Sequence, residues 1–160
     1  MGETGIWLIV TIVCGGLYYF NRYFDMNLHL SGVKLNTMNR SDQEIMCKAM
    51  IEVLADEEGF DTLPKFKFAN LSKIKAAYGD NMRLSGFYDY GLKMIMIDVD
   101  YLSECGDTVK DMANLISHEW QHYVDHLNGI TYDTHGVEIC EARANRFEKK
   151  GSRIICKSLV

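Results

Sequence analysis

Five consecutive residues, His118-Glu119-Trp120-Gln121-His122, combine the side chains of this chain that are best suited to chemistry. They lie in a stretch whose apolar residues repeat with a helical period, so they should share one helix. Residues four apart on a helix lie one turn above each other on the same face. The two imidazoles can therefore bind one cation, with the Glu119 carboxylate beside it. Two nitrogen ligands, a general base and space for water are what a catalytic zinc site needs.

Such a site usually has a third protein ligand, and four side chains downstream could supply it. These candidates are His126, His135, Glu138 and Glu141. His126 extends the four-residue spacing, but each such step drifts about 40° around the helix, so three histidines would converge poorly. Glu141 is the preferred ligand because it lies on a following helix, 19 positions after His122, which leaves residues 128–135 to turn the chain back.

Four other side chains are candidates for supporting roles. Asn145 lies one turn after the third ligand, where its side-chain oxygen could accept a hydrogen bond from a metal-bound imidazole. Asp125 lies seven residues after His118 and returns to within about 20° of its direction, so it could bond a ligand or a water, or be solvated. Tyr132 and His135 lie in the loop that could supply a donor to a developing oxyanion.

The two motifs together resemble the gluzincin branch of the zincin metallopeptidases, in which HExxH precedes a helix that carries ExxxD. The ExxAN-x-F form of residues 141–147 is especially similar to ImmA/IrrE-type peptidases. Residues 140–144 are also similar to the mitochondrial inner-membrane assembly peptidase, and membrane-bound prenyl-protein and heat-shock peptidases share the pattern. The resemblance covers residues 84–147 at most. Asn145 departs from it, because many gluzincins have Asp there, and this departure would weaken the orienting interaction.

The motif and the resemblance both predict a zinc-dependent peptidase that hydrolyses a peptide or protein substrate. His118, His122 and Glu141 would hold Zn²⁺, and Glu119 would accept a proton from the attacking water and pass it to the leaving amine. One alternative is a non-catalytic, metal-stabilised binding or regulatory module tethered to a membrane, which would have no use for Glu119. Another places the histidines in a plain core or on a solvated face with no metal.

The pattern around these motifs predicts an α+β domain over residues 41–160, a minimal zincin-like fold. Its order is a helix, a small antiparallel or mixed sheet, the HExxH helix and the ligand helix. A capping box at Ser41 and Glu44 predicts that the first helix covers residues 42–56.

The segments of the predicted sheet follow that first helix. Alternation around Phe66 and Phe68 predicts a strand, and residues 84–88 and 92–99 predict a hairpin. The strand over 92–99 could bind an extended substrate by strand addition, or be core. Thr108 should cap the HExxH helix, which ends at Asn128, and the ligand helix should cover 136–150.

The N-terminus has a different composition. No charged residue lies between Glu3 and Arg22, and 18 uncharged residues can just cross a bilayer. Residues 1–25 are therefore predicted to be a transmembrane anchor and 26–40 a linker. A signal peptide would need a basic start, which this chain lacks, and a buried core helix is the remaining alternative. Basic residues after the span favour a single-pass protein with its folded domain on the cytoplasmic side.

Composition limits the remaining classes. The chain has 160 residues, a net charge of −5 and no basic cluster, so a nucleic-acid partner is not expected. Its five cysteines are an odd number without a CxxC pair, which favours reduced thiols over a disulfide framework.

Overall fold

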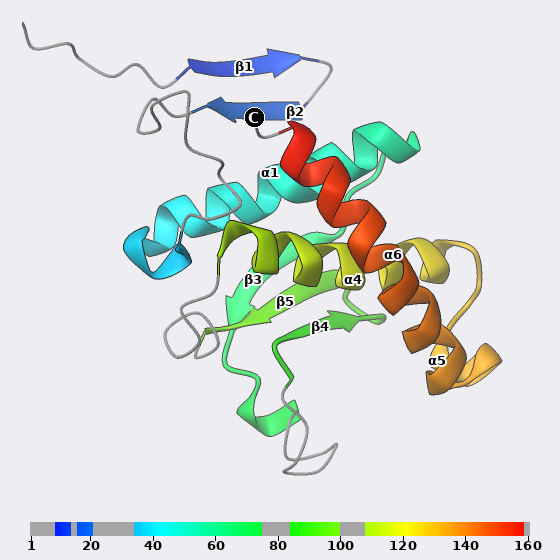
Figure 1. The fold of residues 1–160 in the computed structure, drawn as a ribbon. Coiled ribbons are helices and arrows are strands. Elements are labelled where there is room, and N and C mark those ends of the chain that lie inside the picture. Colours follow the sequence, from blue (N-terminus) through cyan, green and yellow to red (C-terminus); the bar gives the residue numbers. More distant parts are fainter. Residues whose placement is uncertain (1–8, 14–15, 21–33, 75–83, 100–107, 159–160) are drawn as a thin grey trace, which may run out of the picture.

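The computed structural model describes residues 9–13, 16–20, 34–74, 84–99 and 108–158 (Figure 1). This part of the chain is α+β, with long helices packed against a small mixed sheet. The central element is helix α4 (Val109–Leu127), which contacts the sheet, the earlier helix α1 (Arg40–Glu58) and the C-terminal helix α6 (Val137–Ser158). The helix of the HExxH motif is thus surrounded by the rest of the described fold.

Helix α1 follows the short 3-10 helix η2 (Leu35–Thr37) and begins earlier than predicted. Its N-cap is Asn39, whose side chain accepts a hydrogen bond from the Asp42 backbone N–H at 3.0 Å. The predicted cap at Ser41 is wrong, because Asn39 is the residue with extended backbone and Ser41 already lies in the first turn. The helix ends at Gly59, which adopts φ 74° as left-handed caps require.

The sheet contains β3 (Lys65–Ala69), β4 (Gly86–Asp89) and β5 (Met94–Asp98), in the order β3-β5-β4. β5 pairs with β3 in parallel and with β4 in antiparallel fashion, so the predicted strand and hairpin are confirmed and the sheet is mixed. Because β5 is central, its backbone is paired on both sides and cannot accept an added strand. The expectation of strand addition at 92–99 is therefore wrong, and the edge beside α4 belongs to β4.

Helix α4 begins at the predicted cap, where Thr108 and Asp111 form a reciprocal capping box. Its fully buried Trp120 packs edge-on against Phe60 and donates from Nε1 to Glu58 at 3.2 Å. A core cluster of α1, β5 and α4 side chains surrounds this tryptophan, including Met50, Leu54, Ile95 and Ile116. Core packing therefore fixes the rotation of α4 and with it the direction of the HExxH side chains.

Helix α6 follows the short helix α5 (Tyr132–His135) and is longer than predicted. Gly151 was expected to end it near residue 150, but the helix continues to Ser158. The reason is packing: a Cβ at Gly151 would lie 2.5 Å from Ser117 Oγ, so only glycine permits this approach of α6 to α4.

The N-terminal residues differ from the predicted helix. β1 (Ile9–Val13) and β2 (Gly16–Phe20) form an antiparallel pair in which Ile9 faces Phe20, and β2 lies beside α1 (Figure 1). The run is rich in β-branched and aromatic residues, which favour strands. Within the described residues, no helix is both long and apolar enough to cross a bilayer. The rest of the predicted anchor, and linker residues 26–33, lie outside the described residues, so membrane attachment and orientation stay predictions.

Candidate metal centre

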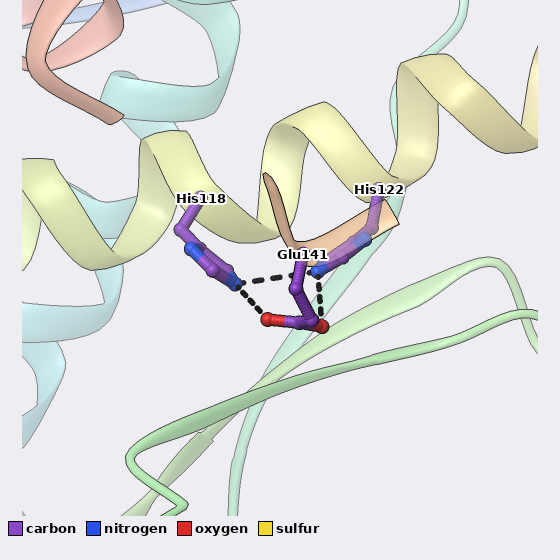
Figure 2. Close-up of side chains that lie close together, drawn as sticks. All are labelled: His118, His122 and Glu141. Atoms are coloured by element: carbon purple, nitrogen blue, oxygen red, sulfur yellow. Dashed lines mark hydrogen bonds and ion pairs between the residues drawn. The ribbon is translucent and has the colours of Figure 1, made fainter. Parts of the chain in front are cut away.

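Three side chains from two helices meet at one point (Figure 2). His118 and His122 extend from α4, and Glu141 extends from the first turns of α6. The two Nε2 atoms are 3.3 Å apart, Glu141 Oε2 is 3.3 Å from Nε2 of His118, and Glu141 Oε1 is 3.3 Å from Nε2 of His122. The structure thus brings together the three residues that the sequence selected as ligands.

The separation of the two imidazole nitrogens fits a tetrahedral zinc ion. With zinc–nitrogen and zinc–oxygen bonds of about 2.0–2.1 Å, neighbouring ligand atoms in a tetrahedron are roughly 3.3–3.4 Å apart. Each imidazole faces a different oxygen of the Glu141 carboxylate, and one ligand atom from each of the three residues lies within 4.8 Å of the others. The donor set of two imidazoles and one carboxylate is also one that zinc uses in catalytic sites.

The four ligand atoms of the cluster are all able to accept a hydrogen bond or bind a cation. If each ring carries its proton on Nδ1, the two Nε2 lone pairs and the Glu141 oxygens all face one point, where they repel one another. A proton or a cation at that point removes the repulsion. The cluster is thus built to hold positive charge.

The charges of the cluster are strongly coupled. Hydrogen bonds from His118 and then His122 hold the pKa of Glu141 well below its ordinary value, so this carboxylate is ionised. Burial opposes the charged form of His118, but its hydrogen bond to Glu141 and the nearby carboxylates outweigh burial and raise its pKa. Both effects favour an anionic ligand beside a cationic partner.

Glu119 lies beside this cluster under strand β4. It is 5% exposed, and burial is the main cause that raises its pKa to about 7, against the opposing charges of His118 and His122. A Cβ at Gly86 would lie 2.7 Å from Glu119 Oε1, so a larger residue at that position would displace this carboxylate from its place beside β4. A buried carboxyl group with a pKa near neutrality is suited to accept and donate a proton.

A cavity of about 380 Å³ opens on the same side of the cluster. It lies between β4 and the two helices, and its lining includes Gly86, His118, Glu119, Asn145 and Glu148. A bound molecule in this cavity would therefore touch one histidine and the candidate base, while His122 lies on the closed side.

Tyr132, a candidate oxyanion donor, lies at the cluster. Its hydroxyl donates to Glu141 Oε1 at 2.5 Å, and its ring packs edge-on against that of His122. Burial, followed by the hydrogen bond to Glu141, raises the pKa of Tyr132 above its ordinary value. The hydroxyl therefore keeps its proton and can act as a donor.

The other candidates lie elsewhere. His126 bonds the Tyr88 hydroxyl through Nδ1 at 2.9 Å, and Glu138 is exposed. His135 is exposed and bonds Thr134 Oγ1, so it is not an oxyanion donor in this arrangement. Asn145 lines the cavity but, among the described residues, is not hydrogen-bonded to either imidazole. The predicted orienting bond is therefore not formed in this structure, and that role of Asn145 stays a prediction.

Two neighbours of the candidate residues were missed from the sequence. Glu148 approaches Nδ1 of His118 at 3.8 Å, the position expected for Asn145. It lies seven residues after Glu141, two helical turns along the same face, a spacing that could have identified it.

The second missed neighbour is Arg143, which binds Asp125. Asp125 is therefore not solvated, and its side-chain hydrogen bonds within the described residues go to Arg143 and Gln121, not to a histidine of the cluster. The buried Nδ1 of His122 has no hydrogen-bond partner within the described part of the chain.

Comparison with known proteins adds no relative. No protein-family model, curated protein or solved structure matches the chain. The resemblance to gluzincins therefore depends on the two motifs alone, and the function must be argued from the site.

Proposed function

We propose that this protein is a zinc-dependent peptidase of zincin type. The observation that carries the proposal is the cluster of His118, His122 and Glu141, with buried Glu119 beside it. The two imidazole nitrogens are spaced as in a tetrahedral zinc site, and each faces one oxygen of the carboxylate. When bound there, zinc would supply Lewis acidity and lower the pKa of a water ligand toward 7.

Glu119 has the properties of the general base. Its pKa of about 7 lets it take a proton from the attacking water near neutral pH and return that proton to the leaving amine. A non-catalytic metal module would gain nothing from a buried carboxyl group, since burying one without a charged partner costs free energy. The carboxyl position beside His118 thus favours the enzyme over the module.

Tyr132 and the β4 edge complete the proposed site. The Tyr132 hydroxyl is a protonated donor next to the cluster and could stabilise the oxygen anion that develops during attack on a carbonyl. An extended peptide could pair with the β4 edge beside the cavity, which would place its backbone along Gly86 and close to Glu119.

The test combines metal analysis with a proteolysis assay on the full chain. The purified protein should contain one zinc ion and cleave an unfolded protein such as casein, with loss of cleavage on chelation. Glu119→Gln should keep zinc and abolish cleavage, whereas Glu138→Gln, a matched change at an exposed α6 carboxylate, should retain both.

A second variant tests the ligand set. Glu141→Ala should reduce zinc affinity by more than the 10- to 100-fold typical of an outer partner, because a direct ligand is lost. Zinc without any cleavage would favour the binding module, and unchanged zinc content in Glu141→Ala would reject this ligand set.

A further inference from the structure

A second polar cluster joins α4 and α6 beyond the histidines, with its acid buried and its Arg143 side chain 44% exposed. Asp125 is fully buried, and both of its oxygens accept hydrogen bonds from the guanidinium of Arg143, each at 2.8 Å. Gln121 Nε2 also donates to Asp125 Oδ1 at 2.6 Å. A bidentate pair of this kind is among the strongest and most directional side-chain contacts.

The ion pair of Asp125 and Arg143 lies close to the metal cluster along both helices. Asp125 lies three residues after His122 on α4, and Arg143 lies two residues after Glu141 on α6. The ion pair therefore joins the helix that carries the imidazoles to the helix that carries the carboxylate, within one turn of both.

The buried stripe of α6 has small side chains near Glu141. There it consists of Cys140 and Ala144, and it continues through Phe147, Gly151, Ser152 and Ile155. At 100° per residue, Glu141 and Arg143 project from opposite flanks of this stripe. The bond from Arg143 to Asp125 holds one flank of α6. It therefore opposes any rotation of α6 about its own axis that would move Glu141, on the other flank, away from the histidines.

The pair also complements the close contact at the other end of the crossing. Gly151 meets Ser117 at one point, and Arg143 meets Asp125 at another, eight residues away along each helix. Eight helical residues extend about 12 Å. Two contacts at this separation oppose both sliding of α6 along α4 and rotation of α6 about the point where the two helices cross. Without the second contact, the start of α6, where Glu141 lies, would be held by the cluster itself and by the packing of two small buried residues, Cys140 and Ala144.

We propose that Arg143, acting through Asp125, is a positioning residue that sets Glu141 against His118 and His122 and so determines zinc affinity. The inference rests on the proposed function, because it takes these three residues as the zinc ligands. This role requires the planar guanidinium of arginine, which bonds both oxygens of Asp125 at once. A lysine ammonium at the same place would leave α6 free to rotate about its axis.

The test measures zinc affinity of the full chain by competition with a chromophoric chelator, and the visible spectrum of the Co²⁺-loaded protein. Arg143→Met should lower zinc affinity by about 10- to 100-fold, the range for outer partners, and shift the Co²⁺ bands. The matched control is Lys150→Met, because Lys150 is another α6 cation that pairs with a different helix, through Glu58 at 3.3 Å. It should leave both measurements unchanged.

Arg143→Lys keeps the charge but not the fork, and it serves if Arg143→Met does not fold. It should show native far-UV circular dichroism, a several-fold lower zinc affinity and a partial shift of the Co²⁺ bands. Zinc affinity and spectra equal to those of Lys150→Met in the folded variants would overturn the positioning role while leaving the zinc site intact. A wild-type protein that binds no zinc would overturn both proposals.

Discussion

The two histidines of the cluster are four residues apart on one helix, yet they lie in different surroundings. The His118 side chain is 17% exposed, borders the cavity with Glu119, and has the Glu148 carboxylate near its Nδ1. The His122 side chain is 3% exposed, packs against the Tyr132 ring, and its Nδ1 has no partner among the described residues. The His118 side of the cluster is therefore open to the cavity and lies near a carboxylate. The His122 side is closed and covered by an aromatic ring.

The difference suggests a division of tasks within one motif. The open side can admit a substrate and contains the proposed base, while the closed side places a hydroxyl donor against the carboxylate ligand. If this division holds, changes on the two sides should affect different measurements, and the following predictions test it in order of expected effect.

The largest effect is expected on the closed side, from Tyr132→Phe. Loss of an oxyanion donor typically lowers kcat about 100-fold or more. Zinc affinity should fall less, by about tenfold, the lower limit for outer partners, because the hydroxyl bonds the ligand Glu141 and neither imidazole. Steady-state kinetics and chelator competition on the same preparation measure both. Equal losses in affinity and turnover would show that the hydroxyl serves the ligand and not the reaction.

On the open side, Glu119 should make the metal-free protein sensitive to pH. Burial raises its pKa from the ordinary 4.5 to about 7, so the folded state binds this proton more tightly than the unfolded state. The resulting stability is complete below pH 4.5 and is lost as pH rises through 7.

Glu119→Gln removes this dependence. Relative to the variant, the free energy of unfolding of the wild type should fall by about 2–3 kcal/mol between pH 4.5 and 8, because each pKa unit corresponds to about 1.4 kcal/mol. Urea titrations in the presence of a chelator measure it, and Glu138→Gln is the control. Parallel pH profiles for wild type and Glu119→Gln would contradict a buried, protonated Glu119.

A smaller effect is expected from Glu148→Gln. Its carboxylate lies 3.8 Å from Nδ1 of His118, longer than a hydrogen bond, so the loss of zinc affinity should fall near tenfold, the lower limit for outer partners. The control is Asn145→Ala, which removes a neighbouring cavity side chain that is not bonded to either imidazole. A greater loss of affinity in Asn145→Ala than in Glu148→Gln would reverse the assignment of the orienting residue.

The smallest effect is expected at His135. This exposed side chain bonds Thr134 and is not part of the cluster, so His135→Ala should leave zinc affinity and kcat within about twofold of the wild type. A tenfold loss in either measurement would mean that α5 moves against the site during the reaction.

Much of the site followed from local spacing in the sequence. The i, i+4 histidines and the neighbouring acid share a helix because helical periodicity is a property of the backbone. The cap at Thr108, the hairpin of β4 and β5, and the choice of Glu141 as the residue to join the histidines were likewise predicted correctly. In each case the signal lies within a few residues or in one helical turn.

The errors occurred where distant segments decide the outcome. Gly151 reads as a helix stop, but its contact with Ser117 makes it a close-packing position inside α6. The other difference is local: the described residues of the predicted anchor form the neighbouring strands β1 and β2, and hydropathy does not distinguish an apolar helix from a pair of apolar strands.

The sequence by itself determined which side chains could bind a cation and which helices would carry them, because those relations depend on backbone periodicity over short distances. Only the tertiary structure decided that Arg143 engages Asp125, that Glu148 takes the place expected for Asn145, and that β4 covers Glu119. These relations depend on how two helices cross and how a strand edge lies against them. Such geometry is set by packing across the whole domain, which no local spacing encodes.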